Sequence, residues 1–158
     1  MSHNIYDVTV IGGGPAGLFS AFYAGLREMK TKIIDGQERL GGKVHLYPQK
    51  MIWDIGGTEP LPAGKLIEKS IAQGLTFDPD VVLNTIVTNI KKVTDDYFTI
   101  ATESGEEHYS KSVIITIGGG GMIQPVKLDV ENADRYEGKS LHYAVPDIMS
   151  FKGKKVLI

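Results

Sequence analysis

The chain contains no cysteine, which excludes structural disulfides, thiolate metal sites and redox-active cysteine pairs within its 158 residues. It also lacks an excess of basic residues, since 17 Lys and Arg are set against 19 Asp and Glu, for a net charge of -2. This balance does not indicate nucleic acid or an anionic membrane surface as a partner. No apolar run is long enough to span a bilayer, and residues 1–4 do not begin a signal peptide. We therefore expect a cytoplasmic protein.

Glycine, in contrast, is abundant, and most of its 19 residues cluster at the ends of apolar runs. Loops that surround a ligand are found at such positions, and the pattern differs from low-complexity disorder. The hydrophobic content of 42% is ordinary for a soluble globular protein. The length is sufficient for one domain with a real core.

The N-terminal segment has the strand–helix–strand pattern that opens a doubly wound α/β fold. Asp7–Ile11 is rich in β-branched residues and predicts a buried parallel strand. Pro15–Arg27 predicts a helix, because proline is tolerated in a first helical turn and apolar residues recur at helical spacing. Thr31–Ile34 predicts a second strand that ends at Asp35. This unit favours a Rossmann-like fold.

The middle of the chain predicts a helix followed by an antiparallel meander. Leu46–Pro62 is rich in proline and glycine and is expected to be irregular, whereas Ala63–Gln73 predicts a helix. Three β-rich segments separated by polar turns follow, at Val81–Val93, Tyr97–Thr102 and Glu107–Ile117. The expected fold class is therefore α/β, a parallel sheet with an inserted antiparallel meander.

The character of the chain changes after four consecutive glycines at residues 118–121. Asp129–Gly138 is polar and predicts a connection, and Lys152–Ile158 predicts a turn followed by a new apolar strand. Because the sequence stops inside that strand, we expect a truncated chain. The expected division is a first domain over 1–118, then a connection and the truncated start of a second nucleotide-binding domain over 119–158.

The main motif is Gly-Gly-Gly-Pro-Ala-Gly at residues 12–17, which fits G-x-G-x-x-G directly after a strand and directly before a helix. Gly12 allows the tight turn, Gly14 lets the backbone approach a pyrophosphate, and Gly17 lets the helix pack close to the strand. The helix N-terminus offers N–H groups and a partial positive charge to phosphates. The candidate binding residues of this motif are Gly12, Gly14, Pro15, Ala16 and Gly17.

An acidic residue completes the fingerprint at the end of the second predicted strand. The carboxylate of Asp35 can accept hydrogen bonds from ribose hydroxyls. The same fingerprint binds either FAD or a nicotinamide dinucleotide, and a glycine-rich turn with no ligand is the structural alternative. With its strand, helix and terminal acid, the motif favours a dinucleotide site.

Two weaker motifs follow. Arg-Leu-Gly-Gly-Lys at residues 39–43 places backbone where it can lie against a ligand and a cation where it can offset phosphate charge. The apolar run at 113–118 ends in Thr-Ile-Gly. Alone, the first could be a surface turn and the second a strand end. Their candidate binding residues are Gly42, Lys43 and Gly118.

In this order the three motifs resemble those of the two-dinucleotide-binding-domain flavoproteins, in which the first fingerprint binds FAD. The segments at 46–50, 53–57 and 131–143 are similar to those of the thioredoxin-reductase-like ferredoxin–NADP reductases of bacteria. The resemblance covers essentially the whole chain, or about the first half of such a reductase. Thioredoxin reductase is the nearest alternative, but Tyr143 and Pro146 stand where its two cysteines would be. Without thiols a dithiol relay is not expected.

The resemblance implies roles for further residues. Tyr47 matches a tyrosine that stacks on the flavin ring, and the alternative is a residue that anchors a loop beside Pro48. Asp54 lies in the segment expected near the flavin, and it could instead be a turn former. Val87 matches a position whose backbone contacts the adenine, and Ile123 is a candidate contact where the family often has an aromatic residue. Lys43 stands where the family usually has glutamine, and lysine keeps a donor but lacks the acceptor of the amide.

The function implied by the resemblance is FAD-dependent electron transfer. NADPH gives hydride to the flavin, which reduces ferredoxin or flavodoxin, and no side chain of this chain need act as an acid or base. The four histidines show no metal spacing. A homodimer is implied, and the chain alone is expected to be inactive because the nicotinamide domain is incomplete. The alternatives are a thioredoxin-reductase-like flavoprotein with another acceptor and a non-catalytic FAD- or NAD-binding module.

Overall fold

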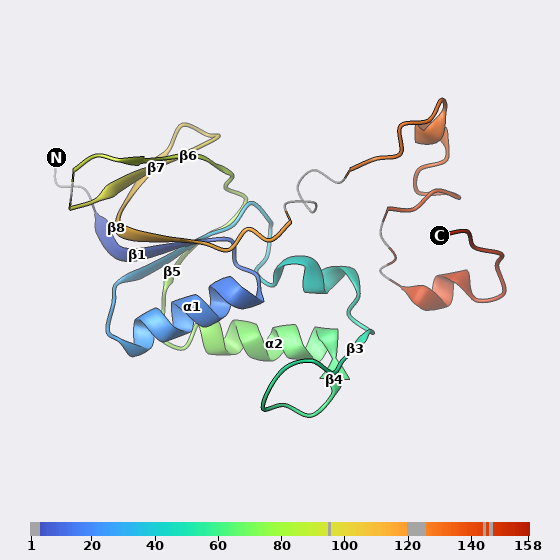
Figure 1. Cartoon of the computed structure of the whole chain (residues 1–158), viewed down its shortest axis with the longest axis horizontal. Coiled ribbons are helices and arrows are strands. Elements are labelled where there is room, and N and C mark those ends of the chain that lie inside the picture. Colours follow the sequence, from blue (N-terminus) through green and yellow to red (C-terminus); the bar gives the residue numbers. More distant parts are fainter. Residues whose placement is uncertain (1–3, 95, 120–125, 144, 146) are drawn as a thin grey trace.

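The computed structural model describes residues 4–94, 96–119, 126–143, 145 and 147–158 (Figure 1). A mixed sheet of six strands has the order β5-β2-β1-β8-β7-β6. Its strands are β1 (Ile5–Ile11), β2 (Thr31–Ile34), β5 (Asp80–Val82), β6 (Val87–Lys92), β7 (Phe98–Thr102) and β8 (Glu107–Ile115). The main helices are α1 (Pro15–Leu26) and α2 (Ala63–Gly74). Short elements complete it: η1 (Gly42–Leu46), β3 (Met51–Ile52), β4 (Leu61–Pro62), η2 (Ala133–Arg135) and η3 (Ile148–Phe151).

The two halves of the sheet differ in strand direction. β1 runs parallel to β2 and β8, and β2 runs parallel to β5, whereas β6, β7 and β8 form an antiparallel meander. The expected α/β architecture with a parallel sheet and a meander is thereby confirmed. β8 belongs to both halves, so the meander is continuous with the parallel strands.

One predicted strand, Val81–Val93, is divided in the structure. Its first part joins the parallel sheet as β5, and its second part forms β6 in the meander. Asn84 lies between them with φ 52°, a conformation that interrupts a strand. Its N–H donates to the Gln37 carbonyl at 2.9 Å, and the next N–H, that of Thr85, donates to the Asp35 carbonyl at 3.0 Å. The prediction of one strand was wrong because the backbone turns at Asn84, where two hydrogen bonds bind it to the segment after β2.

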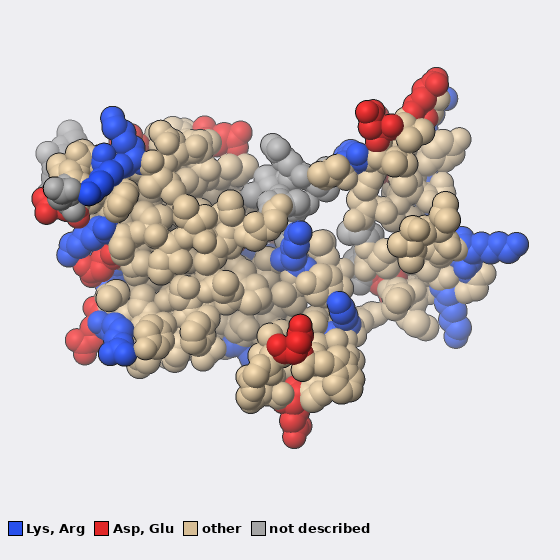
Figure 2. Space-filling view, in the orientation of Figure 1, with Lys and Arg blue, Asp and Glu red and all other residues tan. Residues whose placement is uncertain are grey.

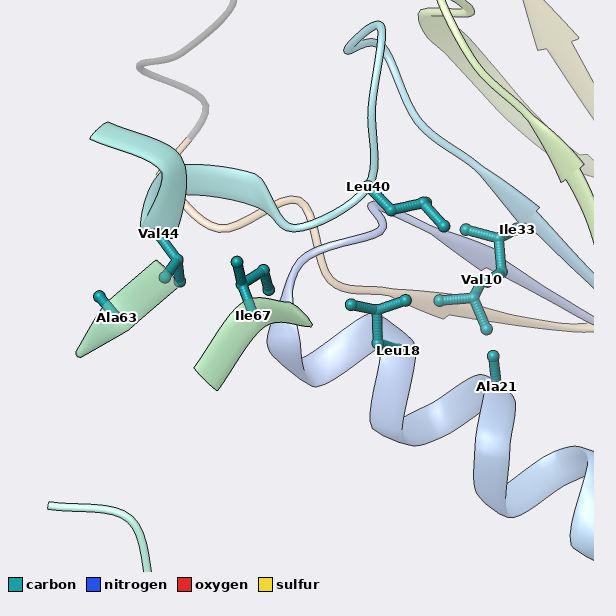
Figure 3. Packing of buried hydrophobic residues seen from close by; sticks show 8 residues of the cluster. All are labelled: Val10, Leu18, Ala21, Ile33, Leu40, Val44, Ala63 and Ile67. Carbon is teal, nitrogen blue, oxygen red and sulfur yellow. The ribbon is translucent and has the colours of Figure 1, made fainter. Parts of the chain in front are cut away.

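A buried apolar cluster joins the parallel strands to the two helices. Figure 3 shows Leu18 of α1 close to Val10 of β1 and Ile33 of β2, with Ile67 of α2 nearby. The side chains of Leu18, Val10 and Ile33 are fully buried. Helix α1 is also apolar on its outer face, where Phe19 is 57% exposed. In Figure 2 the surface over α1 is largely uncharged, and charged side chains gather toward the end where β1 begins.

The segments outside this body contain two departures from expectation. Leu46–Pro62, predicted to be irregular, holds the antiparallel β3–β4 ladder. Lys152–Ile158, predicted to end in a strand, has no strand in the described residues, because nothing pairs with it and Leu157 is 97% exposed. This C-terminal segment lies to one side of the sheet in Figure 1. None of the described helices is both long and apolar enough to traverse a membrane.

Candidate dinucleotide-binding site

A cavity of about 420 Å³ opens at the carboxyl ends of the parallel strands. In open α/β sheets this edge is where ligands bind. The cavity is lined by the fingerprint turn, the loop after β2, the start of η1, the β5–β6 break and the end of β8. Of the predicted site residues it brings together Gly12, Gly14, Pro15, Ala16, Asp35, Gly42, Lys43, Val87 and Gly118.

The glycines of the fingerprint permit close contacts between backbone segments. Gly12 has φ 101°, and a Cβ there would lie 2.5 Å from the carbonyl oxygen of Thr116. Gly17 does not line the cavity, and a Cβ on it would overlap the Gly12 carbonyl oxygen. Gly17 therefore allows α1 to pack against the turn, as the motif predicts.

The N-terminus of α1 lies at the cavity. Gly14 is the N-cap residue, and its carbonyl accepts the N–H of Leu18 at 2.9 Å. Pro15 occupies the first helical turn, and in the described structure no side chain caps this end. The first N–H groups of a helix have no intrahelical acceptor, and the helix dipole is positive there. The arrangement suits the oxygens of a phosphate.

Asp35 is held in place by two backbone N–H groups. The Gly13 N–H donates to Oδ2 at 2.5 Å, and the Gln37 N–H donates to Oδ1 at 2.8 Å. The residue is 8% exposed and lines the cavity. A carboxylate oxygen accepts more than one hydrogen bond, so both oxygens keep capacity for a hydroxyl donor such as a ribose.

The paired glycines bring η1 against the fingerprint turn. Gly42 has φ 60°, and a Cβ on it would lie 3.1 Å from the Cα of Gly14. The next residue, Lys43, lines the cavity, and its ammonium nitrogen would lie 3.2 Å from a Cβ placed on Gly119. Within the described residues Lys43 has no ion-pair partner. Its charge is therefore available to an anion in the cavity.

Several residues of the cavity wall were missed by sequence reasoning: Ile11, Ile34, Gly36, Gln37, Thr85, Ile86, Thr116, Ile117 and Gly119. The β5–β6 break delivers Thr85 and Ile86 to the cavity beside Val87. Asn84, a polar turn-forming residue inside an apolar run, was the sequence signal that could have revealed this break.

Besides Gly17, two of the described site residues are not among those that line the cavity. Tyr47 follows η1, is 37% exposed and has the Lys50 ammonium 5.5 Å from its ring centroid. Asp54 is exposed in the loop between β3 and β4, beside Trp53, which is 74% exposed. Ile123 lies outside the described residues. The roles of these three residues stay predictions.

A second group of titratable side chains lies where the parallel strands begin, away from the cavity. The Tyr6 hydroxyl donates to Asp80 at 2.5 Å, and the Lys32 ammonium lies 3.4 Å from Asp80 and 3.3 Å from His108 Nδ1. Burial and the Asp80 carboxylate raise the pKa of Tyr6 to about 12. Among described residues, His108 Nε2 is buried without a hydrogen-bond partner. Burial, reinforced by the Lys32 ammonium, lowers the pKa of His108, against the opposing effect of Glu106 and Asp80.

This group predicts an acid-sensitive stability. The unfolded state, with a histidine pKa near 6.5, binds a proton at higher pH than the folded state. The contribution of neutral His108 to the free energy of unfolding is therefore complete above this pH. It is lost as the pH falls through the lowered pKa of the folded state. Asp80, whose pKa is lowered by the Tyr6 hydroxyl, adds a further loss of stability only as the pH falls through 3.8, the ordinary pKa of an aspartate, and below. Urea unfolding at pH 7.5 and at pH ~5.5 should show the decrease in wild type and a smaller one in His108→Gln. Equal decreases in both proteins would contradict this assignment.

Comparison with known proteins identifies relatives in both sequence and structure. The sequence profile of pyridine nucleotide-disulphide oxidoreductases matches residues 6–153. Ferredoxin–NADP reductase 1 from Bacillus mycoides is 58% identical over 154 residues, which are 98% of this chain and 44% of the relative. Thioredoxin reductase from Lactococcus lactis is similar in structure, with a TM-score of 0.68 at 30% identity over 83% of this chain and 40% of its own. For T. acidophilum thioredoxin reductase the TM-score is 0.73 at 25% identity, covering 87% of this chain and 42% of that one. The chain thus spans less than half the length of these relatives.

Proposed function

The chain belongs to the pyridine nucleotide-disulphide oxidoreductase family, and on this basis we propose that its cavity binds the FAD of an NADPH-dependent flavin reductase. The observation that carries the proposal is the convergence of a glycine turn, a helix N-terminus and the acid Asp35 on one cavity. These groups match the pyrophosphate and ribose of a dinucleotide. The volume of about 420 Å³ lies in the range of small-molecule sites.

The proposed roles follow the chemistry of each wall. Gly12, Gly14 and the first turn of α1 at Pro15 and Ala16 hold the pyrophosphate, and Asp35 accepts the ribose hydroxyls. Val87 contacts the adenine, and Gly42, Lys43 and Gly118 lie along the phosphates and flavin. Tyr47, Asp54 and Ile123 remain proposed flavin contacts in the complete site. Bound flavin supplies the transfer of hydride and single electrons, while the chain binds and orients it.

We place this site in a reductase that passes electrons from NADPH to ferredoxin or flavodoxin. The support is the set of relatives named ferredoxin–NADP reductase, which are 52% to 58% identical to this chain. The proposed domains are 1–118 for FAD and 119–158 for the connection and the start of an NADP-binding domain. We further propose a cytoplasmic homodimer and, for the 158-residue chain alone, negligible NADPH-dependent turnover.

A thiol-based acceptor reaction is the second function considered, because the similar solved structures include thioredoxin reductases. The 158 residues contain no cysteine, so they cannot supply the dithiol of such a relay. The chemistry of these residues therefore favours direct transfer from flavin to a one-electron acceptor.

Competition between dinucleotides tests the assignment of this cavity to FAD. FAD added to the purified chain should lose fluorescence as it binds, and a fluorescence titration gives its dissociation constant. Addition of NADPH should not displace bound FAD, because the proposal assigns NADPH to a different domain. Displacement by NADPH at comparable concentrations would make this a nicotinamide site and would overturn the proposal.

Lys43 offers a charge-specific prediction at the same site. Replacement by glutamine keeps an N–H donor and removes the charge, so FAD binding should weaken about fivefold at low salt, as expected for an exposed ion pair worth up to ~1 kcal/mol. The difference should shrink at high salt, because exposed charges are screened. FAD titrations of wild type, Lys43→Gln and Lys43→Arg at two salt concentrations measure this, with the arginine variant as the charge-preserving control. An unchanged affinity in Lys43→Gln at low salt would remove Lys43 from the phosphate site.

A further inference from the structure

The Thr-x-Gly motif contributes a side chain that joins β8 to the fingerprint turn. In the parallel register Ile11 of β1 pairs with Ile115 of β8, so the residues that follow them lie side by side. The Thr116 N–H donates to the Ile11 carbonyl at 2.8 Å. The Thr116 hydroxyl lies 2.7 Å from the carbonyl oxygen of Gly12 and 3.1 Å from that of Ile11. A hydroxyl has one proton, and the shorter contact identifies the Gly12 carbonyl as its main acceptor.

The peptide group between Gly12 and Gly13 is thereby held at both ends. Its carbonyl oxygen accepts the Thr116 hydroxyl from β8, and its N–H donates to Asp35 Oδ2 at 2.5 Å from the end of β2. Because a peptide group is planar, fixing its carbonyl and its N–H fixes its orientation. The fingerprint turn, its terminal acid Asp35 and the Thr-x-Gly motif therefore meet at one peptide group of the turn.

The space around this peptide leaves little freedom for adjustment. A Cβ on Gly12 would lie 2.5 Å from the Thr116 carbonyl oxygen, and a Cβ on Gly17 would lie 2.8 Å from the Thr116 hydroxyl. The Thr116 hydroxyl therefore occupies the narrow region between β8, the turn and α1. If the hydroxyl were absent, the half-buried Gly12 carbonyl would lose its hydrogen-bond donor, and the peptide could rotate.

We propose that Thr116 is a positioning residue of the dinucleotide site, which acts through the Gly12–Gly13 peptide on Asp35. Through this peptide it sets the orientation of the carboxylate that receives the ribose and the path of the turn that receives the pyrophosphate. The inference rests on the proposed function, because the ligand is the FAD assigned to this cavity. Thr116 need not touch the ligand for this role.

The test compares removal of the Thr116 hydroxyl with removal of a hydroxyl that has no partner. Thr116→Val is expected to weaken FAD binding about tenfold, as loss of one well-oriented hydrogen bond does, whereas Thr116→Ser should stay within about twofold of wild type. Thr9→Val is the matched control, because Thr9 lies in the same sheet and its buried Oγ1 has no hydrogen-bond partner in the described residues. It should leave FAD affinity unchanged. Equal affinity in wild type and Thr116→Val would overturn the positioning role.

Coupling to Asp35 separates positioning from a general loss of structure. The double variant Thr116→Val with Asp35→Asn should lose FAD affinity by a smaller factor than the product of the factors for the two single variants. The reason is that both substitutions act on one peptide group. Full multiplicativity would overturn the proposal. Thermal unfolding of each apo variant shows that the compared proteins are folded, and Thr116→Ala replaces Thr116→Val if the valine is not accommodated. A wild-type chain that is folded but binds no FAD would refute the proposed function itself, and this inference with it.

Discussion

Replacement of Gly17 by alanine is expected to abolish FAD binding and to lower the free energy of unfolding by about 3 kcal/mol, in the upper range for overpacking. The new Cβ would overlap the Gly12 carbonyl oxygen and would lie 2.8 Å from the Thr116 hydroxyl. Neither neighbour can move freely, because Gly12 follows the buried end of β1 and the Thr116 N–H is hydrogen-bonded to the Ile11 carbonyl. Helix α1 must therefore shift away from the turn, and its N-terminal N–H groups shift with it. Urea unfolding and FAD titration of the variant measure the two effects.

Gly56 provides the matched control for this substitution. A Cβ on Gly56 would have no atom within 4 Å, and its φ lies outside the left-handed region. Gly56→Ala should therefore leave both the free energy of unfolding and the FAD affinity close to wild type. If Gly17→Ala behaved like Gly56→Ala, the close contact between α1 and the turn would not determine the site.

Replacement of Asp35 by alanine is expected to weaken FAD binding about 100-fold, equivalent to ~3 kcal/mol, as for the loss of hydrogen bonds to a charged group. The substitution removes the proposed acceptor of the ribose hydroxyls. It also leaves the N–H groups of Gly13 and Gln37 without their carboxylate partner. The free energy of unfolding should therefore fall by about 2 kcal/mol. Fluorescence titration and urea unfolding measure these two losses separately.

Two further variants bracket the effect of Asp35. Asp35→Asn keeps one carbonyl oxygen as an acceptor, so its FAD affinity should lie between those of wild type and the alanine variant. Asp129→Ala removes a carboxylate of the same type from an exposed position outside the cavity and should have no effect. An Asp35→Ala variant that binds FAD as tightly as Asp129→Ala would exclude Asp35 from the ribose contact.

The local pattern of the sequence was sufficient for the elements that build the core of the site. Pro15 marked the first residue of α1, and Thr31–Ile34 was predicted with the bounds that β2 has. These elements are determined by short-range preferences, such as the fixed φ of proline and the β-branched residues of a buried strand. The glycine spacing likewise located the turn, because few residue types fit a backbone with positive φ.

Features that depend on tertiary hydrogen bonds could not be predicted in this way. The break at Asn84 exists because the following N–H, of Thr85, bonds to Asp35, which is distant in the sequence. The contact between Thr116 and Gly12 spans 104 residues and depends on the parallel register of β1 and β8. No local periodicity carries that information. The predicted C-terminal strand failed for a similar reason, since a strand is defined by its pairing partner.

The resemblance to bacterial ferredoxin–NADP reductases is confirmed by relatives of that name that are more than half identical over nearly the whole chain. The site residues inferred from the resemblance agree with the structure to different degrees. Most of the carried-over residues line one cavity, whereas Tyr47 and Asp54 do not. Both precede α2 in the segment between η1 and β4, where few buried contacts fix the chain. The contact of these two residues with flavin therefore stays a prediction.

The most direct test of the central claim is the absorbance spectrum of the purified chain after incubation with FAD and gel filtration. The account predicts flavin bands that elute with the protein at close to one FAD per chain, and their loss in Gly17→Ala. A chain with folded circular dichroism that elutes without flavin absorbance would contradict the assignment of the cavity to FAD.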